Sequence, residues 1–245
     1  MMGVWANFES LKGEFQVAYK IINSEVVVSN KDLSQLLHDL SIPLSCLNIS
    51  LYSMNCLETQ DFAQLSRQIE LANVANKKLN ELVQSVKIKQ RTDLKPIEEV
   101  ISPLEEVEDI LKLLEAKINK KQLKIIFLKS KNKLWLKHKK TEFFRVIMNL
   151  MSNAIDASHQ KGVLILSIEK LKTGTIKIEI TDNGCGIAQE NLNKIFERGY
   201  STKKQTKNNL GEGLAIAKEL VEKNLGYITV ESQEKQGTSF TIYYR

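Results

Sequence analysis

Hydrophobic residues recur at helical spacing along the first part of the chain. Between residues 33 and 54 they fall three or four positions apart, and Asn30 offers an N-cap ahead of them. After a break at residues 58–61, a second apolar stripe runs from Phe62 to Val86. Two such helices joined by a short turn form an antiparallel hairpin, which buries too little surface to be stable alone. The pattern therefore predicts a helical hairpin at residues 31–93 that pairs with a second copy into a four-helix bundle, a homodimer.

The pattern changes near Lys95, which divides the chain into an N-terminal segment or linker (1–30), the hairpin (31–93) and a second domain (96–245). In the second domain the expected helices are residues 97–119, 141–158 and 212–224. The expected strands are residues 123–128, 133–137, 163–170, 175–181, 226–232 and 237–243. Because helices and strands do not alternate strictly, we expect an α+β fold with helices layered on one face of a mixed sheet.

Composition and charge narrow the classes of protein that fit. The net charge is +6, and the excess of lysines between residues 117 and 140 alternates with apolar residues, which is typical of the solvated side of strands. No nucleic-acid-binding motif accompanies these lysines. Three widely spaced cysteines indicate neither a disulfide framework nor a zinc site. No signal peptide is visible, and the uncharged segment 40–57 contains too many polar residues to enter a membrane. A cytoplasmic protein is expected.

The stretch "LLHDLSIPLS" (residues 36–45) is the first candidate site. At about 100° per residue, His38 points away from the apolar stripe and into solvent. Pro43 has no N–H group for the carbonyl of Asp39, so the helix should bend there. For this stretch alone, an exposed histidine without a role is the simpler interpretation.

The second domain carries two further polar patterns. In "NLMSNAIDAS", Asn149, Asn153 and Asp156 lie on one face of a helix, where amide oxygens suit a hard cation; a buried polar network is the alternative. In "ITDNGCGI", Asp182 ends a β-rich run before Gly184 and Gly186. A carboxylate there can accept a hydrogen bond from an exocyclic amine such as that of adenine, whereas an ordinary glycine turn is the alternative.

The next segment, residues 195–209, is polar and cationic. We expect it to form a mobile flap whose cations bind phosphate, or else a disordered surface loop. Its cationic residues are Arg198, Lys203, Lys204 and Lys207. Gly211 and Gly213 then open a helix, whose free N–H groups can bind an anion.

The order of these motifs resembles the sensor histidine kinases of two-component systems, from about residue 31 to residue 245. "HDLSIPL" is similar to the family's H-box, "NLMSNAIDA" to the N-box and "DNGCGI" to the G1-box. "IFERGYSTK" is similar to the F-box and "LGEGLAIAKELV" to the G2-box. The resemblance implies a HisKA-like dimerisation hairpin and a GHKL-type ATP-binding domain, an α/β sandwich of the Bergerat type.

The resemblance also implies an activity and its residues. The protein would be an ATP-dependent histidine kinase that phosphorylates His38, with Asp39 as the adjacent base, and passes the phosphoryl group to an aspartate on a response regulator receiver domain. Asn153 would bind Mg²⁺, with support from Asn149, and Asp182 would bind adenine. The other implied nucleotide-site residues are Asp156, Gly184, Gly186, Lys203, Gly211, Gly213 and Leu214.

Two positions depart from the family pattern. Ile42 replaces the Thr or Asn that commonly positions water for dephosphorylation of the regulator, so weak phosphatase activity is expected. Asn209 stands where another glycine often begins the glycine-rich run, which bears on the movement of the flap. Two alternatives remain open: a histidine phosphotransfer adaptor without ATP turnover, and another GHKL-type ATPase.

Overall fold

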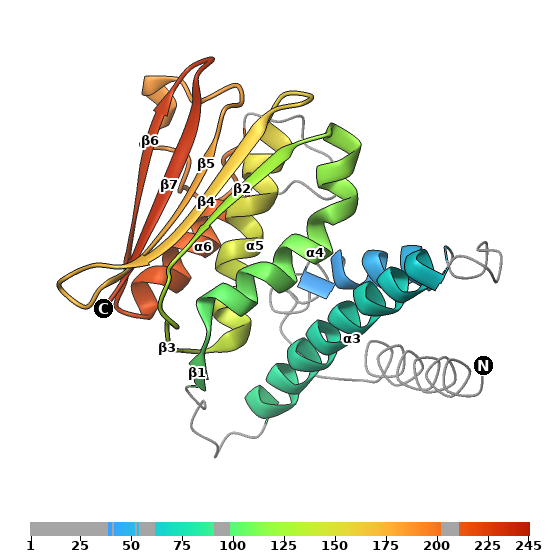
Figure 1. Ribbon diagram of the computed structural model, residues 1–245. Helices are drawn as coiled ribbons and strands as arrows, with labels where there is room; N and C mark the ends of the chain where they lie inside the picture. The colour runs from blue at the N-terminus through green and yellow to red at the C-terminus, as the bar shows by residue number, and fades with distance from the viewer. Residues whose placement is uncertain (1–38, 41, 52, 54–61, 91–98, 202–210) are drawn as a thin grey trace. The chain divides into compact units, whose positions relative to one another are not determined.

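A computed structural model describes residues 39–40, 42–51, 53, 62–90, 99–201 and 211–245 (Figure 1). The chain divides into two units, Met1–Lys95 and Pro96–Arg245. No helix in these described ranges combines the length and the apolar character that a membrane crossing requires.

The first unit is helical where the structure describes it. Residues 42–51 are α-helical, and α3 spans Phe62–Gln90. The stripe positions Leu40, Leu47, Ala72 and Leu79 are all buried, as their helical spacing predicts. Pro43 lies within the first helical run and is itself buried. His38 lies outside the described residues, so its exposure, like the bend at Pro43 and the four-helix bundle, stays a prediction.

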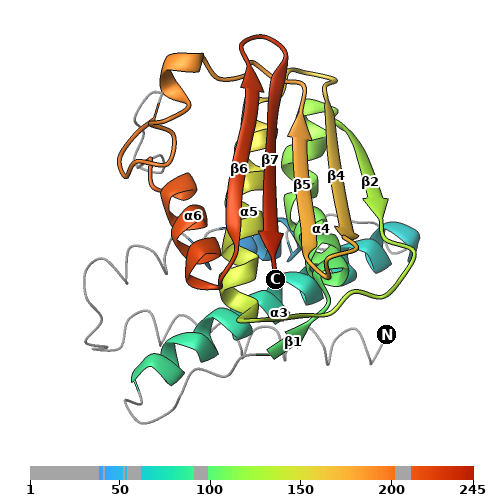
Figure 2. The ribbon, with the colours of Figure 1, turned by 90° about the vertical axis from the view of Figure 1, so that its left-hand side faces the viewer.

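The second unit is built on a five-stranded sheet. Its strands are β2 (Lys124–Lys129), β4 (Val163–Lys170), β5 (Ile176–Asp182), β6 (Tyr227–Gln233) and β7 (Gly237–Tyr244). Figure 2 shows them in the order β2-β4-β5-β7-β6. The β2–β4 pair is parallel and the other pairs are antiparallel, which confirms the predicted mixed sheet. A separate two-stranded sheet pairs β1 (Glu99–Ile101) with β3 (Leu136–His138).

Three helices cover one face of this sheet (Figures 1 and 2). They are α4 (Pro103–Lys121), α5 (Lys140–Ala157) and α6 (Gly213–Lys223); a 3₁₀ turn, η1, spans Gln189–Asn191. Helix α5 contacts β5 and β7 as well as both other helices. The inward positions of β4 and β5 alternate with outward ones, as a sheet with one buried face requires. Helix α5 is therefore the centre of the core, and its remaining face is available for polar residues.

The predicted start of the helix at residue 97 was wrong. Strand β1 occupies Glu99–Ile101, and α4 begins at Pro103 with Ser102 as its N-cap. The Ser102 hydroxyl accepts a hydrogen bond from the backbone N–H of Glu105 at 3.4 Å. Proline at the first helical position needs no N–H partner, so it fixes the start of the helix there.

A cluster around Glu142 joins the start of α5 to the end of α6. The Glu142 carboxylate accepts hydrogen bonds from Lys223 Nζ at 2.8 Å and from Asn224 Nδ2 at 2.9 Å. Burial raises the pKa of Glu142, but these two hydrogen bonds and the charges of Lys223 and Lys139 outweigh it. The pKa therefore lies below its ordinary value of 4.5.

We expect Glu142→Gln to lower the free energy of unfolding by about 1 kcal/mol at pH 7, because two charge-assisted contacts lose their charge. A carboxyl group whose pKa is lower in the folded than in the unfolded protein stabilises the folded state at pH values above its unfolded-state pKa. This stabilisation is lost as the pH falls through the pKa of the group in the folded state. The gap between wild type and variant should therefore shrink below about pH 4. Thermal unfolding at several pH values measures it.

The matched control is Glu222→Gln, which removes an exposed ion pair with Lys218 on α6. Such pairs contribute little, so this variant should differ from wild type by only a few tenths of a kcal/mol. An equal loss in both variants, or a Glu142 effect that does not depend on pH, would contradict the expectation.

Candidate functional site

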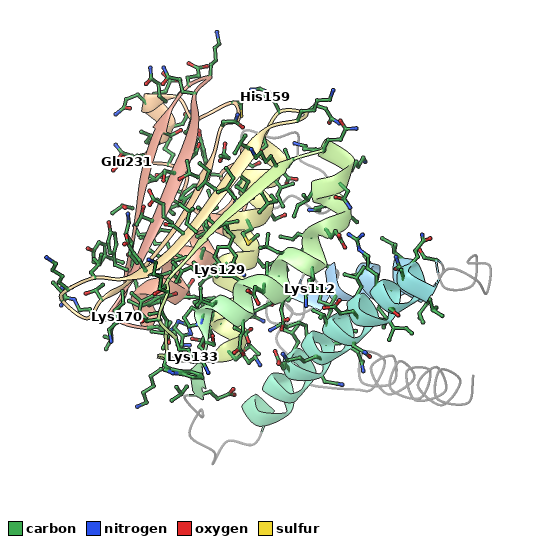
Figure 3. The ribbon with its side chains drawn as sticks, viewed as in Figure 1. Lys112, Lys129, Lys133, His159, Lys170 and Glu231 are labelled. Atoms are coloured by element: carbon green, nitrogen blue, oxygen red, sulfur yellow. The ribbon has the colours of Figure 1, made fainter. Side chains whose placement is uncertain are left out.

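The last residue of β5 is a buried carboxylate. Asp182 is only 3% exposed, and its Oδ1 accepts a hydrogen bond from the backbone N–H of Gly184 at 2.8 Å. Burial raises the pKa of Asp182 above its ordinary value, while the N–H groups of Gly184 and Thr238 and the charge of His159 act in the opposite direction. His159 lies in the turn after α5 (Figure 3). Asp182 is thus a buried hydrogen-bond acceptor held by backbone groups.

The loop after Asp182 packs directly against the end of α5. A Cβ atom at Gly184 would lie 2.3 Å from the carbonyl oxygen of Ala157. The next residue, Cys185, donates its backbone N–H to the same oxygen at 3.2 Å. No side chain fits between the loop and the helix, so glycine is required at position 184 for steric reasons.

The same loop is held on its other side by the turn between β6 and β7. Cys185 accepts the backbone N–H of Lys235 at 2.7 Å, and Ile187 donates its N–H to Ser232 Oγ at 2.9 Å. Gly186 has φ of +67°, and a Cβ atom there would lie 2.0 Å from the carbonyl oxygen of Gln233. Both backbone conformation and space therefore require a glycine at position 186.

Helices α5 and α6 pack against each other. Asn149 and Asn153 are half-buried, and Asp156 is exposed on the same face of α5. Gly213 begins α6, and a Cβ atom there would lie 3.4 Å from Asn149 Oδ1. No side chain caps the N-terminus of α6, and Leu214 lies in its first turn. The first N–H groups of a helix have no partner within the helix, so an anion can bind them.

The described ends of the flap are close to each other. Gly199 donates its backbone N–H to the carbonyl of Gly211 at 3.2 Å, and Gly211 has φ of +68°. Arg198 pairs with Glu219 of α6 and so connects the start of the flap to that helix. Lys203, Lys204, Lys207 and Asn209 lie outside the described residues, and their predicted roles stay predictions.

The arrangement suits a ligand with a flat base at one end and anionic groups at the other. Asp182 offers an acceptor for an amine. Asn149 of α5 lies next to the N-terminus of α6, where anions are favoured. Within the described part of the chain, no cluster of His, Cys, Asp or Glu side chains could hold a metal ion. Asn149 and Asn153 offer amide oxygens, a ligand type that a hard cation accepts.

Comparisons with known proteins indicate an ATP-binding domain. Residues 138–245 match the family "Histidine kinase-, DNA gyrase B-, and HSP90-like ATPase". The sensor histidine kinase ZraS of Escherichia coli is 39% identical over 99 residues, which are 40% of this chain and 20% of that protein. The adaptive-response sensory kinase SasA of Synechocystis is 26% identical over 225 residues, which are 88% of this chain and 59% of that protein.

A solved structure, the catalytic domain of histidine kinase ThkA, aligns with a TM-score of 0.54 at 26% identity, covering 60% of this chain and 95% of that domain. Residues 138–245 therefore form a GHKL-type ATP-binding domain, and the chain is similar to sensor histidine kinases. It spans between about a fifth and three fifths of the length of the first curated relatives.

The structure places some of the site residues predicted in the ATP-binding domain in two groups. Asp182, Gly184 and Gly186 line one loop, whereas Asn149 and Gly213 face each other across α5 and α6. Cys185 is exposed and lies between the two loop glycines, with its backbone bonded on both sides. Asp39, which follows His38 in the H-box stretch, is helical and half-buried.

Sequence reasoning did not single out two residues that lie next to Asp182. Gly237 has φ of +117°, and a Cβ atom there would lie 2.0 Å from the carbonyl oxygen of Asp182. Thr238 is the register partner of Asp182 across β5 and β7 and is 4% exposed. The dipeptide Gly-Thr at the start of the last strand was the available signal, but its meaning depends on the strand order.

We expect Gly184→Ala to destabilise the ATP-binding domain by about 2–3 kcal/mol, because the added methyl group overlaps the Ala157 carbonyl and forces the backbone to move. Gly213→Ala is the control, since its methyl group would make only a close contact with Asn149 and alanine favours a helix. Thermal unfolding compares the two. Equal melting temperatures in both variants would contradict the packing of the loop on α5.

Proposed function

We propose that this chain is an ATP-dependent protein-histidine kinase. It phosphorylates His38 and passes the phosphoryl group to an aspartate in the receiver domain of a response regulator. The observation that carries the proposal is that α5 connects two features: its end packs on the loop that follows the buried Asp182, and its Asn149 lies next to the uncapped start of α6. These elements match the adenine end and the phosphate end of ATP in one domain.

The reaction transfers the γ-phosphoryl group to a histidine nitrogen. One ring nitrogen of His38 attacks the γ-phosphorus, so an N–P bond forms while the bond from that phosphorus to the β,γ-bridging oxygen breaks and ADP leaves. Asp39 accepts the proton of the other ring nitrogen and makes the attacking nitrogen more nucleophilic. A phosphohistidine then donates the same group to the regulator's aspartate.

The ATP-binding domain contributes position and charge. Asp182 accepts a hydrogen bond from the adenine amine, and Gly184 and Gly186 shape the loop that holds this carboxylate. Asn153, supported by Asn149, would hold Mg²⁺ through amide oxygens, a ligand type that this ion accepts. When bound there, the ion would neutralise charge on the phosphates. Asp156, Gly211, Gly213 and Leu214 complete the pocket, and Lys203 contacts phosphate from the flap.

The proposal includes partners and a location. The crystal structure of histidine kinase ThkA in complex with the response regulator protein TrrA aligns with this chain at 19% identity and a TM-score of 0.51. A similar fold therefore binds a response regulator, which supports this kind of partner here. The hairpin at residues 31–93 pairs two chains into a homodimer, and the protein works in the cytoplasm.

The proposal also includes weak phosphatase activity. Ile42 is half-buried in the helical run 42–51 and has no polar atom on its side chain. It cannot orient a water molecule toward a phosphorylated aspartate, as a hydroxyl or amide side chain can. Phosphate is therefore added to the regulator faster than this chain removes it.

The test of kinase activity is to incubate the full chain with Mg²⁺ and ATP labelled on the γ-phosphate. We expect acid-labile, base-stable label on the protein that disappears in His38→Gln. The control Asn48→Gln, at an exposed position of the helical run 42–51, keeps His38 and should keep the label. Label that survives in His38→Gln would overturn the choice of phosphoacceptor.

The same assay separates the alternatives. A chain that takes no label from ATP but accepts phosphate from a phosphorylated regulator is a phosphotransfer adaptor. A chain that hydrolyses ATP without becoming labelled is another GHKL-type ATPase. Either result would contradict the kinase proposal.

We expect Ile42→Thr to speed phosphate release from the phosphorylated regulator, in the presence of ADP, by about tenfold or more, because a hydroxyl can position the attacking water. Ser45→Thr, at an exposed position of the same helical run, is the control and should change nothing. Fast release by wild type that Ile42→Thr leaves unaffected would reject weak phosphatase activity.

A further inference from the structure

The end of α5 leaves backbone carbonyls that need partners from outside the helix. The residue after the helix, Ser158, is extended (φ −63°, ψ 145°), so no glycine turn closes the helix. Ser158 satisfies the carbonyl of Ala154 with its N–H at 3.0 Å and its hydroxyl at 2.7 Å. The loop residue Cys185 bonds the carbonyl of Ala157. The carbonyls of Ile155 and Asp156 still require donors.

Lys121, the last residue of α4, supplies them. Its Nζ lies 2.8 Å from each of three carbonyl oxygens, those of Ile155, Asp156 and Ser158. An ammonium group has three donors, and all three are used here. Its positive charge also faces the negative end of the α5 dipole. One side chain therefore caps a helix that begins 19 residues after it in the chain, at Lys140.

Backbone contacts strengthen the same junction. The carbonyl of Lys121 accepts the N–H of Lys161 at 2.8 Å, so the turn after α5 is held to the end of α4. On the opposite side of this turn, Asn183 Oδ1 accepts the N–H of Val163 at 2.8 Å. The turn, which carries His159 in Figure 3, is thus held by α4 on one side and by the loop after Asp182 on the other.

We infer that Lys121 is a positioning residue of the nucleotide site, an inference that rests on the proposed function. The cap fixes the last turn of α5, and the Ala157 carbonyl in that turn sets the position of Gly184 and Cys185. Gly184 in turn holds the Asp182 carboxylate through its N–H. Lys121 touches neither base nor phosphate, and it acts through the helix end and the loop.

The neighbouring Lys117 shows what an ordinary connection between α4 and α5 looks like. Its Nζ makes one exposed hydrogen bond, to Ser152 Oγ at 3.1 Å, and it contacts no carbonyl of the last turn. Removing Lys117 therefore loosens the helix pair without freeing the end of α5. This difference makes Lys117→Met the matched control for Lys121→Met.

The experiment uses the full chain, with two readouts for each variant. The first is the hydrogen-exchange rate of the Cys185 amide without nucleotide, and the second is the affinity for ADP in the presence of Mg²⁺. Lys121→Met should speed the exchange and weaken ADP binding about tenfold, which corresponds to about 1.4 kcal/mol. Lys121→Arg keeps the charge and donors and should recover most of both, and Lys117→Met should stay within about twofold of wild type.

The outcomes are distinct. One outcome would overturn the inference: Lys121→Met melts at a lower temperature, but its ADP affinity and its Cys185 exchange rate equal those of Lys117→Met. Lys121 would then be only structural. If Lys121→Met does not fold, Lys121→Gln, which keeps one donor group, replaces it with the same criteria. Failure of wild type to bind ADP would refute the proposed function, whereas the exchange of the Cys185 amide still tests the link from Lys121 to the loop.

Discussion

The close approach of the Gly184 backbone to the carbonyl of Ala157 is the constraint on which the candidate site depends. It joins the end of the central strand β5 to the end of the central helix α5 with no side chain between them. Two further glycines allow equally close packing on the other side of the loop. Gly186 packs against the β6–β7 turn, and Gly237 packs against the Asp182 backbone. The sheet, the helix and the loop therefore fix one another, and Asp182 has one position relative to the polar face of α5.

This construction has an energetic consequence for the free domain. A carboxylate that is 3% exposed loses most of its hydration, and only part of that loss is recovered through the backbone N–H groups of Gly184 and Thr238. A protein without a ligand to bind at that point would be more stable with an apolar residue there. Under the proposed function, the adenine amine of a bound nucleotide would offset this cost.

Much of the second unit follows from local pattern. The predicted bounds of α5, β4 and β5 match the structure to within one residue, and each of these elements has one buried face. Strand β1 was missed because three residues give no period, and the Ser-Pro-Leu-Glu signal at residues 102–105 for the start of α4 was overlooked. Gly237 and Lys121 could not be predicted, since their contacts join segments that only the tertiary fold brings together.

The most direct measurement is residue-level hydrogen exchange of the full chain with and without ADP and Mg²⁺. If the ATP site lies where α5, α6 and the loop after β5 converge, ADP should slow amide exchange in Gly184–Ile187 and in the first turn of α6, and leave the edge strand β2 unchanged. Protection that is absent, or that appears at β2 and the β1–β3 sheet instead, would contradict this location of the site.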